Sequence, residues 1–92
     1  MSQPKMKYRW AVRRTQNEPG EFSKLVSNTN GYTTKLLQAY DHISDALETH
    51  SLEAESFRDL FDSFSKLCGI YAKTYRVDGG RVTVLLYRLP KD

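Results

Sequence analysis

The clearest pattern in the chain is an alternation of apolar and polar residues close to the N-terminus. Over residues 6–14 apolar side chains occupy one parity and mostly basic ones the other: Met6, Tyr8, Trp10 and Val12 alternate with Lys7, Arg9, Ala11 and Arg13. This period of two predicts a β-strand with one buried and one solvent-facing side. Trp10 is therefore expected in the core, and the Asn-Glu-Pro-Gly run at residues 17–20 is expected to form the turn that ends the strand.

The next segment has no clear pattern, and after it the period becomes helical. In residues 21–32, Phe22, Leu25 and Val26 fit a single helical turn, but the Asn-Thr-Asn-Gly run at residues 28–31 is typical of a break. From about Thr34 to Thr49, apolar residues recur every three or four positions: Leu36, Tyr40, Ile43 and Leu47. That spacing predicts an amphipathic helix.

A second helix is expected to begin near Ser51. Serine is a favoured N-cap, and Glu53 and Glu55 would suit the positive end of the helix dipole. The apolar stripe of this helix contains Phe57, Leu60, Phe61, Phe64, Leu67 and Cys68. Gly69 is a suitable stop, and Cys68 is expected to be a buried small hydrophobic residue.

The C-terminal part predicts a β-hairpin. Two β-rich runs, Ile70–Val77 and Arg81–Leu89, flank the turn residues Asp78-Gly79-Gly80. The predicted order is β-α-α-β-β, and the predicted fold is a two-layer α+β domain over residues 1–92. Its three-stranded, largely antiparallel sheet would be covered on one face by the helix pair.

Two registers of this hairpin remain open. With a two-residue turn, the side chains that face the core are Tyr71, Tyr75, Val77, Val82, Val84 and Leu86. The side chains on the uncovered side are then Arg76, Arg81, Thr83 and Tyr87. A three-residue loop places Ile70, Ala72, Thr74, Val82, Val84 and Leu86 inside, and leaves Tyr71, Lys73, Tyr75, Arg81, Thr83 and Tyr87 outside. A shift of one residue moves every side chain of a strand to the other face. Both registers keep basic residues on the uncovered side.

Charge is sorted along the chain rather than mixed. Residues 1–16 and 69–92 together carry ten basic and two acidic residues, a net charge of +8, whereas residues 17–68 carry −5. The total of +3 hides this asymmetry. Charge sorting of this size concerns binding partners, because it sets long-range attraction rather than the fold.

The basic strands supply a candidate partner-binding surface. Its expected members are Lys7, Arg9, Arg13, Arg14, Lys73, Arg76, Arg81 and Tyr87. Arginine and lysine neutralise phosphates and aromatic rings stack on unpaired bases, so this mixture suits single-stranded nucleic acid or an RNA backbone. The competing interpretation is that basic residues on exposed strands discourage edge pairing and keep the protein soluble.

Acidic residues form two stripes at helical spacing. The first contains Asp41, Asp45 and Glu48, and the second contains Glu55, Asp59 and Asp62. Like charges four residues apart slightly destabilise a helix. The stripes could contact a basic protein surface, or repel nucleic acid so that it binds only through the sheet; a merely solvated helix face is the simpler interpretation.

No pattern points to an enzyme, a cofactor, a metal or a small-molecule substrate. The two histidines, His42 and His50, have no recognisable nucleophile or acid partner, and the acidic stripes lack His or Cys ligands. No apolar run is long enough for a signal peptide or a membrane span, and the single cysteine fits a reducing cytoplasm. We therefore expect a cytoplasmic, non-enzymatic protein.

In type, the chain resembles the small inhibitors encoded by bacteriophages, anti-CRISPR proteins among them. The resemblance rests on a length of 92 residues, on a lone α+β domain without a catalytic motif, and on the basic strands KMKYRWAVRR and YAKTYRVDGGRVTVLLYR beside acidic helices. That group shares no sequence motif, so no residue role carries over. The resemblance implies docking, in the host cytoplasm, on an RNA-guided CRISPR effector and exclusion of its target DNA.

Two functions are therefore expected from the sequence. The first is a non-enzymatic interaction protein that docks on a multi-subunit protein–nucleic acid complex and inhibits it. The second is an autonomous module that binds single strands or an RNA backbone through its basic sheet. The acidic helices and the lack of a known nucleic-acid-binding signature rank the first ahead.

Overall fold

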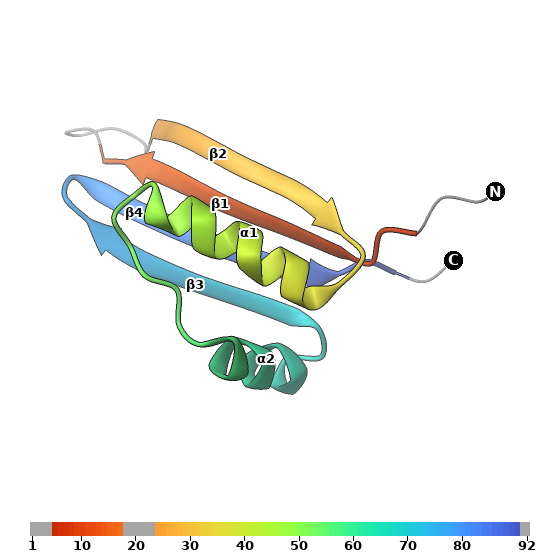
Figure 1. Ribbon diagram of the computed structural model, residues 1–92. Coiled ribbons are helices and arrows are strands. Elements are labelled where there is room, and N and C mark those ends of the chain that lie inside the picture. Colours follow the sequence, from red (N-terminus) through yellow and green to blue (C-terminus); the bar gives the residue numbers. More distant parts are fainter. Residues whose placement is uncertain (1–4, 18–23, 91–92) are drawn as a thin grey trace.

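The computed structural model of the protein describes residues 5–17 and 24–90 (Figure 1). Its elements, in order, are β1 (Tyr8–Gln16), β2 (Lys24–Thr33), α1 (Leu36–Glu48), α2 (Phe57–Lys66), β3 (Ile70–Val77) and β4 (Gly80–Arg88). The α+β class is as predicted. Most of the turn predicted at residues 17–20 lies outside the described residues.

The four strands form one antiparallel sheet in the order β2-β1-β4-β3. The prediction of a three-stranded sheet and a β-α-α-β-β order is wrong by one strand, β2, which occupies the unassigned segment. β2 is an edge strand whose side chains are mostly exposed, so it has no apolar alternation to reveal it. Its Asn-Thr-Asn-Gly run at residues 28–31 does not break the strand, because every one of these residues pairs with β1.

Gly31 has a specific place in β2. It pairs with Trp10 across the sheet, and a Cβ at position 31 would lie 3.0 Å from the indole nitrogen of Trp10. The absence of a side chain at Gly31 therefore makes room for the indole. Trp10 is buried in the core, as predicted, and its ring stacks on His42 of α1 at a centroid distance of 5.3 Å.

The β3–β4 hairpin has the two-residue turn. Val77 pairs with Gly80 across Asp78 and Gly79, and Gly79 has a φ of 78°, which glycine adopts without strain. This register is the first of the two alternatives. It turns Tyr71, Tyr75 and Val77 toward the helices, together with Val82, Val84 and Leu86.

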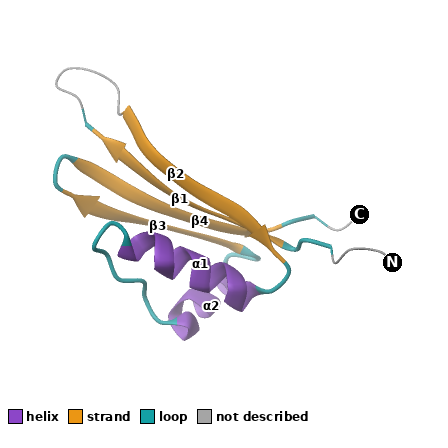
Figure 2. Cartoon of the chain, turned by 45° about the horizontal axis from the view of Figure 1, so that its top comes forward, coloured by secondary structure: helices purple, strands orange, loops and turns teal. Residues whose placement is uncertain are grey.

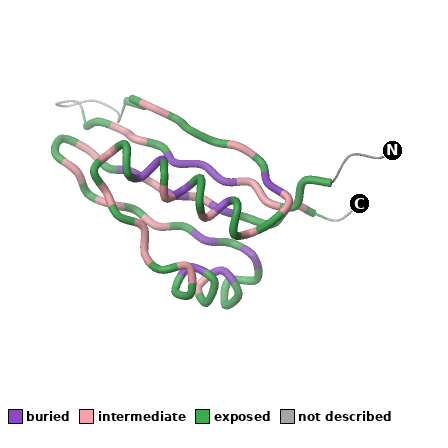
Figure 3. Tube along the Cα trace, viewed as in Figure 1, coloured by how far each residue is buried: buried purple, intermediate pink, exposed green. Residues whose placement is uncertain are grey.

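Both helices lie on the same face of the sheet (Figure 2). α1 packs against β1 and β2, and α2 packs against β3. The buried sides of the helices face the buried strand residues (Figure 3). The core contains Trp10, Val12, Ala39, Ile43, Ala46, Leu47, Leu60, Phe64, Tyr71, Val82, Val84 and Leu86. The predicted helix near residues 34–49 is confirmed as α1.

The second helix begins later than predicted. Its N-cap is Ser56, whose side-chain oxygen accepts a hydrogen bond from the backbone N–H of Asp59, and not Ser51. Ser51 instead has a φ of 59° in the turn that closes α1, where its N–H donates to the Glu48 carbonyl. The run after α1 is therefore a linker and not the first turn of α2.

The end of α2 confirms Gly69 as the stop and corrects the expectation for Cys68. The Gly69 N–H donates to the Phe64 carbonyl and the Cys68 N–H to the Ser65 carbonyl, the hydrogen-bond pair of a Schellman motif. Cys68 occupies the left-handed position of this motif, with a φ of 57°, and its side chain is exposed rather than buried. The apolar spacing of α2 continues in the sequence past the last helical residue, which is why the sequence indicated a buried Cys68.

Candidate functional site

Within residues 5–17 and 24–90, no element covers the face of the sheet opposite the helices (Figure 2). Strand pairing arranges the side chains of this face in four rows. Each row crosses the sheet from β2 to β3. The rows are Tyr32–Arg9–Tyr87–Ile70, then Asn30–Ala11–Leu85–Ala72, then Asn28–Arg13–Thr83–Thr74, and last Leu25–Thr15–Arg81–Arg76. We call this surface the open face.

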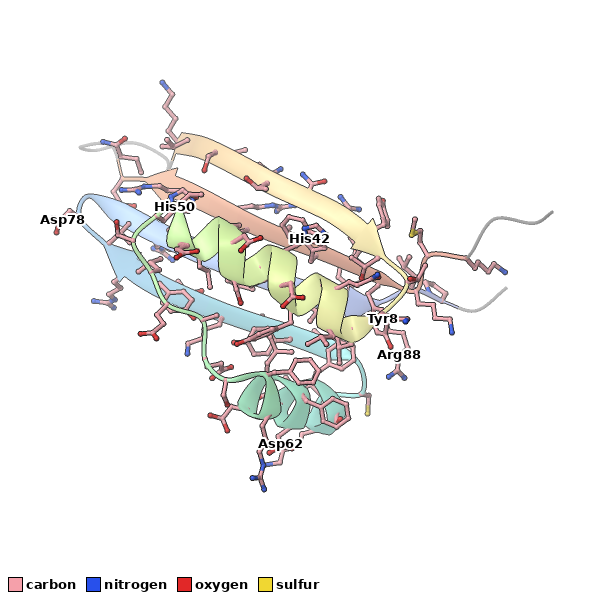
Figure 4. All side chains as sticks on the ribbon, viewed as in Figure 1. Tyr8, His42, His50, Asp62, Asp78 and Arg88 are labelled. Atoms are coloured by element: carbon pink, nitrogen blue, oxygen red, sulfur yellow. The ribbon has the colours of Figure 1, made fainter. Side chains whose placement is uncertain are left out.

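No acidic residue occurs in any of the four strands. They carry eight basic residues, Arg9, Arg13, Arg14, Lys24, Lys73, Arg76, Arg81 and Arg88. In the described part of the chain, the acidic residues belong to the helices, the α1–α2 linker and the hairpin turn. Figure 4 shows Asp62 on the outer side of α2 and Asp78 at the tip of the β3–β4 hairpin. The sorting of charge along the sequence thus becomes a sorting between two layers.

Most of the predicted binding residues share the open face. Arg9 and Arg13 of β1, Arg76 of β3, and Arg81 and Tyr87 of β4 lie in its rows. Lys7 directly precedes β1, has the same parity as Arg9 and is exposed; its backbone continues the sheet through hydrogen bonds with Thr33 and Leu89.

Two predicted members, Arg14 and Lys73, lie on the helix-covered side instead. Arg14 has the parity of Val12, and its Nη1 donates to Nδ1 of His50 at 3.3 Å, next to the end of α1. Lys73 Nζ lies 3.5 Å from a carboxylate oxygen of Glu55. The structure therefore separates these two from the other six.

Tyr32 also belongs to the open face, although the sequence did not indicate it as a binding residue. Its side chain is 51% exposed, and the Cζ of Arg9 lies 5.4 Å from the centre of its ring. Arg9 is paired with Tyr32 on one side and Tyr87 on the other, and its guanidinium lies over the Tyr32 ring. The only signal in the sequence was an aromatic residue at the end of a polar run.

At the opposite end of the open face, two arginines lie directly across from each other. Arg76 of β3 pairs with Arg81 of β4, and both are exposed. They line a shallow hollow of about 560 Å³ together with Asn17, Thr74 and Gly80. Like charges directly opposite on neighbouring strands destabilise a sheet, so this pair reduces the stability of the hairpin.

On the covered side, Glu55 holds the α1–α2 linker against β3. The Tyr71 hydroxyl donates to the Glu55 carboxylate, Lys73 approaches the same carboxylate, and the Tyr40 hydroxyl donates to the Glu55 carbonyl at 2.8 Å. Burial, the hydrogen bond to Glu55 and the charge of Glu55 raise the pKa of Tyr71 above the ordinary tyrosine value. Burial also raises the pKa of Tyr75, whose ring Lys73 contacts, although Lys73 opposes that shift.

The acidic stripes are only partly helical. Asp41, Asp45 and Glu48 lie exposed on α1, and Asp59 and Asp62 lie exposed on α2. Glu55 precedes α2 and faces β3, so it is not part of a surface stripe. The helix layer nevertheless presents acidic residues to solvent on the side of the molecule away from the open face.

Both histidines on or near α1 have contacts that account for them. His42 stacks on Trp10, and Nδ1 of His50 accepts a hydrogen bond from Arg14. Figure 4 labels both histidines, at α1 and just after it. Within residues 5–17 and 24–90, no three His, Cys, Asp or Glu side chains are grouped so that they could hold a metal ion. Neither helix in that part of the chain is long and apolar enough to cross a membrane.

Comparisons with known proteins show no relative of this chain: no family model, no curated protein and no solved structure matches it.

The Tyr71–Glu55 contact leads to a prediction about stability. Replacing Tyr71 with Phe should lower the free energy of unfolding by about 1–2 kcal/mol at neutral pH, because the partly buried Glu55 carboxylate loses its hydroxyl donor. The raised pKa makes this contribution present below about pH 10, where an unfolded tyrosine ionises, and lost as the pH rises further. Urea denaturation at pH 8 and above pH 10 measures both effects.

The control is Tyr87→Phe, which removes a hydroxyl from the open face. It should change stability little at pH 8. A loss in Tyr71→Phe no larger than in this control would contradict the structural role assigned to the contact.

The Arg76–Arg81 pair leads to a second prediction. Arg76→Gln should raise the midpoint of urea denaturation slightly, because it relieves repulsion between paired like charges. The gain should disappear near 1 M salt, where the Debye length falls to about 3 Å. Arg58→Gln on α2 removes an exposed arginine that lies on the helix layer and should give no such gain. A destabilised Arg76→Gln protein at low salt would refute the repulsion argument.

Proposed function

We propose that this protein is a non-enzymatic interaction protein whose open face binds the nucleic-acid component of a partner complex. The observation that carries the proposal is the charge of the sheet. A broad, uncovered surface carries Arg9, Arg13, Arg76 and Arg81 and contains no acidic side chain. Arginine side chains on such a surface neutralise phosphates, and release of the counterions drives binding.

The position of the arginines favours this function over protection of sheet edges. Basic residues that discourage aggregation belong on edge strands. Arg9, Arg13 and Arg81 lie on β1 and β4, which are the two central strands. Of the two edge strands, β2 carries one basic residue, Lys24, and β3 carries Lys73 and Arg76. Edge protection can therefore explain Arg76 but not the three arginines of the central strands.

The helix layer restricts how a polyanion approaches. Asp41, Asp45 and Glu48 on α1 repel phosphates on the far side. A nucleic acid is thus directed to one face and is not wrapped around the whole molecule. This geometry supports docking on one exposed stretch of nucleic acid.

The proposal predicts a strong salt dependence carried by named arginines. With four to five phosphates neutralised, the logarithm of the association constant for a single strand should fall with the logarithm of salt concentration with a slope of roughly −3 to −3.5. Replacing Arg9, Arg13 and Arg81 together with Gln should reduce the slope by about 2. Fluorescence anisotropy with labelled RNA and DNA across a salt series measures this.

Two controls separate the open face from total charge. Arg58→Gln with Lys35→Gln removes two positive charges from the helices and their caps, and Lys24→Gln removes one from the edge strand. These variants should keep nearly all of the slope. An equal loss of salt slope in the open-face variant and in these controls would mean that the basic residues of the open face serve only to keep the protein soluble. The lack of any complex at low salt would reject the proposal.

Inhibition of a larger complex is a second candidate, and one observation favours it. The oppositely charged layers offer an acidic protein-facing surface in addition to the basic face. A phage inhibitor of the anti-CRISPR type would use both on one RNA-guided effector. Preincubation with a type I CRISPR complex should then block target-DNA binding, and Asp41→Asn with Asp45→Asn should weaken the block. An undiminished rate of target binding would reject this candidate.

A further inference from the structure

We propose that the open face recognises single-stranded nucleic acid specifically, with a base-stacking section at one end and a phosphate-binding section at the other. The base-stacking section is the row of Tyr32, Arg9 and Tyr87. The phosphate-binding section is Arg13, Arg76 and Arg81. This inference rests on the proposed function, because it names the ligand class for the same face.

The base-stacking section consists of flat groups that face solvent. Tyr32 is 51% exposed and Tyr87 is 36% exposed, so neither ring is used in the core. They flank Arg9 in a row, and because neighbouring strands lie about 4.8 Å apart, the two tyrosine backbones are about 10 Å apart. Both aromatic rings and a guanidinium plane can stack on unpaired bases. The row therefore offers two exposed rings for stacking, and Arg9, whose guanidinium lies over the Tyr32 ring, adds a positive charge that can also meet a phosphate.

The middle of the open face allows a strand to lie close to the sheet. Ala72 has a small exposed side chain, Ala11 is only 4% exposed, and Asn28, Asn30 and Thr83 supply neutral amide and hydroxyl groups. The one large side chain in the row beside the tyrosines is Leu85 of β4, and no row contains an acidic side chain. A nucleic-acid strand can thus follow β1 along its length.

The phosphate-binding section lies at a distance that fits a short oligonucleotide. Thr15 is the β1 member of the last row and lies six residues after Arg9. The distance between these two residues along the strand is therefore about 20 Å. A stacked strand covers this length in about six nucleotides, at roughly 3.4 Å for each. Arg13 lies between the ends, and Arg76 and Arg81 line the hollow at the far end. The repulsion between Arg76 and Arg81 is relieved when a phosphate binds between them.

A duplex should contact the phosphate-binding section and not the base-stacking section. Paired bases are stacked inside a duplex and cannot contact the tyrosine row, whereas the phosphates of a duplex remain available to the arginines. The arrangement therefore predicts a preference for single strands over duplexes of the same length. It also predicts that affinity rises with oligonucleotide length up to about six to eight nucleotides and then levels off.

The test compares variants that keep or remove the rings. Four probes are used: a labelled single-stranded RNA of about twelve nucleotides, the corresponding DNA, the duplex with its complement, and a linear polyphosphate. Tyr32→Val and Tyr87→Val remove the rings but suit a strand, and each should weaken single-strand binding about five- to hundredfold. Tyr32→Phe and Tyr87→Phe keep the rings and should bind like the original protein. Circular dichroism and urea denaturation verify that each variant is folded.

The salt series adds a second readout. The valine variants should lose affinity without a change in salt slope, because stacking releases no counterions. Arg76→Gln should lower the slope by about 0.7 for a single strand. This division between the two ends of the open face is not expected of residues that merely stabilise the fold.

The outcomes separate the two proposals. Equal affinity for single strands, duplex and polyphosphate, with no loss in the valine variants, would overturn single-strand recognition and leave polyanion binding in place. No binding of any probe at low salt would overturn both. Single-strand preference that is lost with the valine variants and kept with the phenylalanine variants supports the inference.

Discussion

The whole arrangement depends on the pairing of β1 on both of its sides. All nine residues of this strand pair with β4, and the same nine pair with β2 across one bulge. Its apolar parity places Trp10 and Val12 in the core, where each large side chain contributes roughly 1.5–3 kcal/mol by burial. Its other parity places Arg9 and Arg13 on the open face. A slip of one residue in the pairing of β1 would exchange the two sets and bury charged side chains. The register that forms the core is therefore the same register that forms the candidate site.

The elements with strong local patterns could be predicted from the sequence, and the edge strand could not. The alternation of β1, the helical spacing of α1 and the Asp78-Gly79 turn each follow from neighbouring residues. β2 lacked such a signal because pairing with β1, and not burial, holds it in place, and because its glycine is explained only by a tryptophan 21 positions earlier. The start of α2 was misplaced since Glu55 resembled a helix-dipole residue and is in fact a partner of Tyr71.

The candidate site was predictable in composition and not in arrangement. The sequence indicated a basic sheet, and both hairpin registers left basic residues exposed. Only the pairing of β1 with β4, between residues more than sixty positions apart, shows that Arg9 lies beside Tyr87. Only the existence of β2 adds Tyr32 to that row. Arg14 and Lys73 could not be told apart from the open-face cations by charge, and it is their parity within the strands that places them beneath the helices.

The separation of the two charged layers determines where their fields act. An α-helix with its side chains is about 10–12 Å across, so the exposed carboxylates of α1 lie farther than that from the arginines of the open face. At physiological ionic strength the Debye length is about 8 Å. At that ionic strength the acidic layer therefore does little to weaken the positive potential of the open face, while it still repels phosphates that approach the helices. If the open face binds a polyanion, as we propose, a thin two-layer fold achieves one-sided binding with a net charge of only +3, and strand parity rather than total charge sets the binding side.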